Sequence, residues 1–228
     1  MPTKTVISYD GTDNDRDALA LGKALEPVSR LALAYVTHTG DGSGERELAE
    51  TLLRKGADEL GQAQVDQHVE LNASTPDGLR DLAAREGADV VVFGSEYRTA
   101  DGSVNPGTSA RRLFDGSPFA VAVAPANLRS RGDFAIRSIG VLAEGGDDAP
   151  AETARRLAAA LGATVTEPGN GPVDLLIVGS RDGTPVGTVR LSATVDYAIE
   201  TASSPVLAVP RGQAVGFDAA TAGVGAEG

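Results

Sequence analysis

The sequence has no cysteine and no tryptophan, and only 4% of its residues are aromatic. Without cysteine the chain has no disulfide, no thiolate nucleophile and no cysteine-ligated metal. Its core must therefore consist of Val, Leu, Ile and Ala, and the apolar fraction of 41% is large enough for one. No apolar run approaches the roughly 18 residues of a membrane span, and the first ten residues lack the apolar segment of a secretion signal. We therefore expect a soluble cytoplasmic protein.

Positive charge is also scarce in this chain. It has 20 Lys and Arg residues against 32 Asp and Glu residues, which gives a net charge of −12. A field of that sign repels the phosphate backbone of nucleic acids and anionic lipid headgroups. Nucleic acid and membrane surfaces are therefore not expected as partners.

One sequence pattern occurs twice. Residues 89–98 read DVVVFGSEYR and residues 174–183 read DLLIVGSRDG, at a shift of 85 residues. Upstream, VISYDGTD at 6–13 matches residues 140–147 within IGVLAEGGD (139–147), but here the shift is 134 residues. The second copy therefore lacks 49 residues between its two anchors. Because only the first copy is complete, we expect any ligand site to lie there.

The repeat divides the chain into unequal parts. We predict a complete domain at 1–127, called the first half below, and a truncated copy at 137–211, called the second half. The polar segment 126–136 is interpreted as a linker between them. The C-terminal residues 212–228 are rich in Gly and Ala without a period, so this tail is predicted to be disordered.

In the first half, apolar runs alternate with helical patterns, which is typical of an α/β protein. The runs predict strands at 4–10, 30–38, 64–71, 89–95 and 119–125, and the helical patterns lie at 15–25, 45–61, 75–87 and 108–116. In the helix 45–61, Leu48, Leu52 and Leu60 are expected on one face. Strands this apolar are buried on both faces, which indicates a doubly wound, Rossmann-like parallel sheet covered by helices. For this order of elements we expect the strand order 3-2-1-4-5, with the alternating run 64–71 at an edge.

The second half predicts a shortened version of the same unit. Its strands are expected at 138–144, 163–168, 173–180 and 205–210, and its helices at 149–161 and 191–202. The missing segment corresponds to the second helix, third strand and third helix of the first half. An unpaired apolar edge strand is an aggregation hazard. We therefore predict that 119–125 and 205–210 pair antiparallel across a pseudo-twofold axis, giving an intramolecular pseudo-dimer that is a monomer or forms a homodimer.

Two loops of the first half lie where the strand order reverses, which is where ligands bind in such sheets. They are DGTD at 10–13 and GSEYRTADGSVNPGT at 94–108. In the second loop, a turn after Gly94 and free backbone N–H groups beside Thr108 would suit a phosphate. The side chains expected to add positive charge are Arg98, Arg111 and Arg112. The alternative is an ordinary surface loop with glycines at turns and Thr108 as a helix cap.

The first half resembles the universal stress protein family, and the whole chain resembles a tandem member of it. Nucleotide-binding members carry Gly, two residues, Gly, nine residues, Gly, and then Ser or Thr. Gly94, Tyr97, Gly107 and Thr108 hold those positions here, so three of the four match. In the second half the same register gives one match of four. The second-half site is therefore expected to be inactive.

The resemblance implies a stress-response or signalling protein that binds ATP or a related adenine nucleotide weakly, with Mg²⁺ accompanying it, and that acts on an unknown protein partner. The residues that it implies as ligand contacts are Asp10 for the ribose, the Val36 backbone for the adenine, and Gly94, Gly107, Thr108 and Ser109 for the phosphates. The alternative is a nucleotide-free structural or interaction module of the same fold. No general base or set of arginines and metal ligands is evident, so at most slow ATP hydrolysis is expected.

Tyr97 is the departure that decides between these alternatives. If the position needs a left-handed backbone, Tyr costs roughly 1–2 kcal/mol, which lowers affinity about tenfold. If it needs glycine because a phosphate approaches closely, the ring blocks the site. A third interpretation is that Tyr97 marks a chain that no longer binds nucleotide.

Three other sequence patterns do not indicate a functional site. The segment TGDGSGER at 39–46 resembles a dinucleotide fingerprint, but Glu45 stands where its third glycine should be. No histidine follows Ser95, which excludes a Ser-His hydrolase of that chain order. Asp13, Asp15 and Asp17 are interpreted as solvated charges at the start of a helix rather than as metal ligands.

Overall fold

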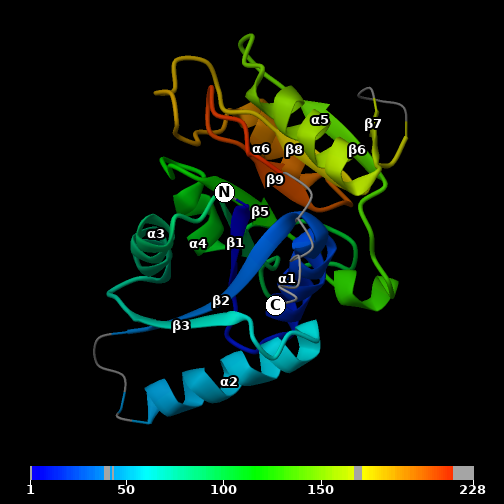
Figure 1. Ribbon diagram of the computed structural model, residues 1–228. Helices are drawn as coiled ribbons and strands as arrows, with labels where there is room; N and C mark the ends of the chain where they lie inside the picture. Colours follow the sequence, from blue (N-terminus) through cyan, green and yellow to red (C-terminus); the bar gives the residue numbers. More distant parts are fainter. Residues whose placement is uncertain (1, 39–41, 43, 167–170, 218–228) are drawn as a thin grey trace, which may run out of the picture.

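The computed structural model describes residues 2–38, 42, 44–166 and 171–217. Over these residues the chain forms one nine-stranded sheet, in the order β3-β2-β1-β4-β5-β9-β8-β6-β7 (Figure 1). The strands are β1 (Thr3–Ser8), β2 (Ser29–Thr37), β3 (Asp66–Leu71), β4 (Val90–Phe93), β5 (Ala120–Val123), β6 (Ser138–Leu142), β7 (Thr164–Thr166), β8 (Leu175–Val178) and β9 (Val206–Ala208).

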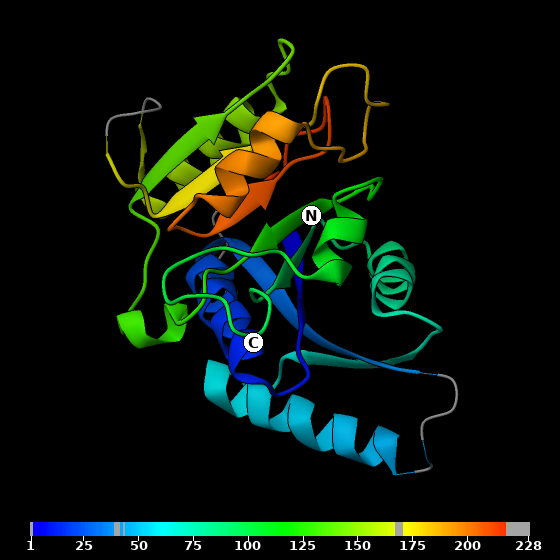
Figure 2. The ribbon, with the colours of Figure 1, turned by 180° about the vertical axis from the view of Figure 1, so that it is seen from behind.

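Helices cover both faces of this sheet, because alternate residues of the strands are apolar on each side. The helices are α1 (Asp13–Leu25), α2 (Glu45–Leu60), α3 (Thr75–Glu86), α4 (Thr108–Leu113), α5 (Ala149–Leu161) and α6 (Ala193–Glu200), with 3₁₀ turns η1 (Glu26–Val28) and η2 (Leu128–Arg131). One core cluster contains buried residues of α1, α2 and α5, and the other contains those of α3, α4 and α6. Figure 2 brings α4 and α6 to the front. Within the described ranges, no helix is long and apolar enough to cross a membrane.

The strand order of the first half is 3-2-1-4-5, as the sequence predicts, with β3 at the edge. All strand pairs are parallel except β5 and β9, which are antiparallel, with Val121 opposite Ala208 and Val123 opposite Val206. The predicted antiparallel pairing of these two strands is therefore confirmed. It makes one continuous sheet, because β9 covers the edge that β5 would otherwise expose.

The second half repeats the contacts of the first half in the predicted register. Ser95 Oγ donates to the Ala124 carbonyl at 2.7 Å, and Ser180 Oγ donates to the Val209 carbonyl at 2.9 Å. Each hydroxyl also accepts a backbone N–H ten residues later, at 3.2 Å in both halves. These serines hold the end of a strand against its neighbour, which is a structural role. In the described residues between α5 and β8, the only regular element is the short strand β7.

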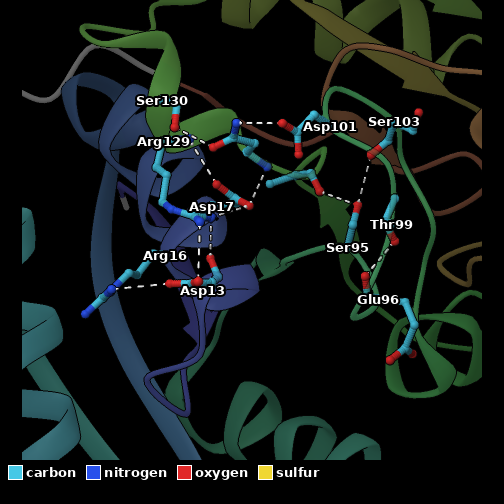
Figure 3. A network of polar contacts seen from close by, with 12 residues as sticks. Asp13, Arg16, Asp17, Ser95, Glu96, Thr99, Asp101, Ser103, Arg129 and Ser130 are labelled. Atoms are coloured by element: carbon cyan, nitrogen blue, oxygen red, sulfur yellow. Dashed lines mark hydrogen bonds and ion pairs between the residues drawn. The ribbon is translucent and has the colours of Figure 1, made fainter.

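The segment 126–136 is packed rather than a free linker, and Asp17 is the reason (Figure 3). The Asp17 carboxylate is 1% exposed and forms an ion pair with the Arg129 guanidinium at 3.0 Å. It also accepts the backbone N–H groups of Asn127 at 2.8 Å and Arg129 at 3.0 Å. The prediction that Asp17 is a solvated helix charge is therefore wrong. Its partners lie more than a hundred residues away in the sequence, where the local pattern gives no sign of them.

Two smaller predictions also need correction. Residues 212–217 are not disordered, because Val215 and Phe217 are buried and the Thr3 hydroxyl donates to the Gly216 carbonyl at 2.6 Å. The rest of the predicted disordered tail, 218–228, lies outside the described residues. On α2, Leu48 is 49% exposed, while Leu53 and Leu60 face the core. The leucine stripe of this helix is therefore shifted from the predicted face.

Candidate functional site

A cleft of about 410 Å³ lies between the carboxyl ends of β1 and β4, where the strand order reverses. We call it the first-half cleft. It collects five of the six predicted ligand residues, namely Asp10, Gly94, Gly107, Thr108 and Ser109. The other lining residues are Ser8, Thr12, Asn14, Asp15, Thr75, Phe93, Ser95, Glu96, Tyr97 and Ala110.

Val36 is the predicted residue that does not line the first-half cleft. It lies near the end of β2, opposite Glu70 of β3. Its side chain packs against α3, since a Cβ added to Gly78 would lie 2.8 Å from Val36 Cγ1. The adenine contact expected from the Val36 backbone thus remains a prediction.

Gly94 is required by packing against α1. A Cβ at this position would lie 1.9 Å from the backbone carbonyl oxygen of Asn14, in the first turn of that helix. Such a distance is far inside van der Waals contact, so no other residue fits without displacing α1. The glycine allows α1 to begin directly beside the end of β4, which forms one wall of the first-half cleft.

The loop from Ser95 to Pro106 is closed at its base by these two residues, which form an isolated β-bridge. The Glu96 N–H donates to the Asn105 carbonyl at 2.8 Å, and the Thr99 hydroxyl donates to the Glu96 carbonyl at 2.6 Å (Figure 3). These bonds fix the backbone of Glu96, whose exposed side chain places its carboxylate close to Gly107. A Cβ added to Gly107 would lie 2.8 Å from Glu96 Oε2.

The Asp10 turn forms the opposite side of the first-half cleft. Asp10 Oδ1 accepts the Thr12 N–H at 2.9 Å, and the Asp10 N–H donates to the Asp15 carboxylate. Burial, followed by the nearby Asp10, raises the pKa of Asp15 well above its ordinary value. At this position the Asp15 carboxyl group favours its protonated form. A ligand anion in the cleft would raise the free energy of the ionised form further.

The first-half cleft is acidic, contrary to the sequence prediction. Its lining contains the carboxylates of Asp10, Asp15 and Glu96, and no Lys, Arg or His among the described residues. The three arginines expected there lie elsewhere. Arg111 forms an ion pair with Glu200 at 2.9 Å, and the Arg98 guanidinium lies over the Tyr97 ring, 5.2 Å from its centre. Arg112 is exposed and does not line the cleft.

Tyr97 adopts an ordinary backbone conformation. The described non-glycine residues with positive φ are Arg98 and Asn127, so the left-handed position follows Tyr97. The strain considered for Tyr97 is therefore absent. Its side chain is 71% exposed and stands at the rim of the first-half cleft.

In the corresponding crevice of the second half, side chains of the chain contact one another. Glu144, which matches Asp10 in the repeat, accepts a hydrogen bond from the Ser192 hydroxyl at 2.8 Å. A Cβ at Gly179 would lie 2.8 Å from the ring of Pro150. The Glu144–Ser192 contact distinguishes this crevice from the first half, where Asp10 instead accepts the Thr12 N–H, whereas the glycine after the strand is tightly packed in both halves.

The sequence reasoning missed two features. The first is Glu96. The sequence places this residue in the loop between Gly94 and Gly107, but it does not show that the carboxylate points toward Gly107. The second is a groove of about 690 Å³ between α1, α5 and the segment 132–137, called the seam groove below. Its floor includes Leu19, Phe134 and Leu161. The candidate fingerprint at 39–46 is partly outside the described residues, and its described residues line neither hollow.

Comparison with known proteins identifies the fold. No family model matches the sequence, and no curated protein is detectably similar to it. Among solved structures, a universal stress protein from Archaeoglobus fulgidus shares 14% identity over 92% of this chain and 98% of its own, with a TM-score of 0.58. A protein assigned to the same family, from Pseudomonas aeruginosa, shares 12% identity over 92% and 94%, with a TM-score of 0.66. The chain therefore has the universal stress protein fold.

Proposed function

We propose that a chain with this universal stress protein fold acts as a stress-response protein that binds an adenine nucleotide weakly in the first-half cleft. One observation carries the proposal: five residues expected from the sequence motif line one cavity at the reversal of strand order. The volume of about 410 Å³ lies within the range of small-molecule sites. The proposed role is ligand binding without a chemical step, and the bound ligand would change the association with an unknown protein partner.

In this proposal the ligand lies along the cleft from Asp10 to Gly107. Asp10 is exposed and accepts hydrogen bonds from the ribose hydroxyls, and the adenine extends beyond the cleft lining toward the backbone of Val36. Thr108 and Ser109 supply hydroxyl groups at the phosphate end, beside Gly107. Mg²⁺ would arrive with a triphosphate, since the described residues contain no group of three His, Asp or Glu side chains placed to hold a metal.

One observation favours the second candidate function, a nucleotide-free interaction module. The lining of the first-half cleft carries the carboxylates of Asp10 and Glu96, and also Asp15, whose raised pKa disfavours its charged form, and among the described residues it includes no cation. Phosphate groups are repelled by such a lining. The two candidates are distinguished by whether any adenine compound binds.

Isothermal titration calorimetry tests the proposal. We expect the tightest-binding adenine compound to have a dissociation constant of about 1 mM, which corresponds to roughly −4 kcal/mol. Gly107→Val should weaken this binding at least about tenfold, because the new side chain occupies the cleft and pushes the Glu96 carboxylate into it.

Gly42→Val is the matched control, because a Cβ at Gly42 meets no atom within 4 Å and Gly42 does not line the cleft. It should bind as the unchanged chain does. The absence of heat for adenosine, AMP and ATP at millimolar concentration would leave the nucleotide-free module as the function.

A further inference from the structure

We infer that Glu96 is a specificity-determining residue that replaces a ligand phosphate, so that the first-half cleft prefers an adenine nucleoside to its phosphorylated forms. This inference rests on the proposed function and names the ligand class of the same site. It differs from what the sequence motif implies, because the motif assigns the Gly107 end of the cleft to phosphates.

The Glu96 carboxylate lies at the Gly107 end of the first-half cleft. Glu96 Oε2 lies 2.8 Å from the place of a Cβ on Gly107, and Oε1 accepts the Tyr97 N–H at 3.2 Å. The carboxylate is therefore already at the end of the cleft where the motif predicts a phosphate. Its backbone is fixed by the bond from its N–H to the Asn105 carbonyl, so a ligand phosphate must displace the side chain or lie beside it.

The charge of the cleft lining disfavours a ligand phosphate. A phosphate at the Gly107 end would meet the carboxylate of Glu96, and the Asp10 carboxylate lies at the other side of the cleft. No Lys, Arg or His among the described residues lines the cleft to offset them. Two like charges about 4 Å apart repel each other even in water, and more strongly at a protein surface. Each added ligand phosphate should therefore lower the affinity.

The uncharged lining suits the rest of a nucleoside. Thr12, Thr75, Thr108 and Ser109 present hydroxyl-bearing side chains, and Asp10 can accept hydrogen bonds from a diol. These groups pair with a ribose and with the polar edge of a base without requiring an anion.

The second half supplies an independent parallel. There the carboxylate of Glu144 accepts a hydrogen bond from Ser192, the N-cap residue of α6. Ser192 occupies the position of Gly107 in the repeat. In both halves, therefore, a carboxylate of the chain lies at the position that the motif assigns to phosphate. The chain supplies its own negative group twice, from two different sequence positions.

The test is calorimetric titration of the full chain and of Glu96→Gln with adenosine, AMP, ATP and inorganic tripolyphosphate. Glu96 is exposed, so the variant should fold normally. The unchanged chain should bind adenosine about tenfold or more tightly than ATP and should not bind tripolyphosphate. Glu96→Gln should bind ATP about tenfold more tightly than the unchanged chain, keep its adenosine affinity within about twofold, and gain measurable tripolyphosphate binding.

Glu47→Gln is the control, because it makes the same change of charge on an exposed α2 residue outside the cleft. It should behave as the unchanged chain does. ATP binding at least as tight as adenosine in the unchanged chain would overturn the inference, as would an unchanged ratio in Glu96→Gln. If no adenine compound binds but Glu96→Gln gains tripolyphosphate binding, the proposed function fails and the role of Glu96 stands; if neither occurs, both are overturned.

Discussion

A chain cut after Arg131 is expected to elute as dimers and aggregates rather than as a monomer. The cut removes β9, whose Val206, Leu207 and Ala208 are at most 1% exposed against β5. The exposed β5 edge is then a row of unpaired backbone groups flanked by apolar side chains, which pairs with any similar edge. Covering each large side chain contributes about 1.5–3 kcal/mol, so the drive to cover this strand is considerable.

The cut is placed after Arg131 because Asn127 and Arg129 bond to Asp17 of α1, and removing them would destabilise the fragment for a separate reason. Size-exclusion chromatography with light scattering measures the result. The control is a chain that ends at Phe217, which keeps β9 and every described residue and should elute as the full chain does. A monomeric 1–131 fragment with a cooperative unfolding transition would show that β9 is not needed to protect β5.

Asp17→Ala is expected to lower the free energy of unfolding by about 2–4 kcal/mol, because two part-buried backbone N–H groups lose their acceptor at about 1–3 kcal/mol each, while the 34% exposed Arg129 regains contact with water. The substitution leaves the Arg129 guanidinium without its buried partner and two backbone N–H groups of 127–129 without an acceptor. A loss of that size is a large fraction of the stability of an ordinary domain. Urea denaturation followed by circular dichroism measures it.

Asp13→Ala is the matched control for Asp17→Ala. Asp13 also approaches Arg129, at 3.6 Å, but its side chain is 69% exposed, so water replaces the contact. We expect a loss of less than about 1 kcal/mol, as for other surface ion pairs. Equal losses in the two variants would contradict the view that burial makes Asp17 the anchor of the segment 126–136.

The strands and their order were predictable because apolar runs buried on both faces have few arrangements in a doubly wound sheet. The pairing of β5 with β9 was predictable as well, because the repeat supplies a second edge strand for the first. Asp17 was not, since a local pattern of acidic residues at a helix start does not reveal partners brought in by the tertiary fold. The burial of Phe217 could not be predicted either. A single apolar residue in a Gly- and Ala-rich segment has no periodicity that would indicate a buried position.

The candidate site was predictable as a place and not as an electrostatic environment. The spacing of Gly94 and Gly107 predicted where the loop lies, because the backbone packs too closely at Gly94 for any side chain and the motif records such positions. The directions of Glu96 and Arg98 depend on how the loop closes at Ser95 and on the backbone turn at Arg98. Those features follow from the folded loop, so the predicted basic site proved to be acidic.

The most direct test of this account is a crystal structure of the full chain soaked in adenosine at millimolar concentration. We expect density for one adenosine in the first-half cleft, with its ribose hydroxyls at Asp10 and with the Glu96 carboxylate still beside Gly107. Density for adenosine in the seam groove instead, or an empty first-half cleft in crystals whose packing leaves it open, would contradict the account.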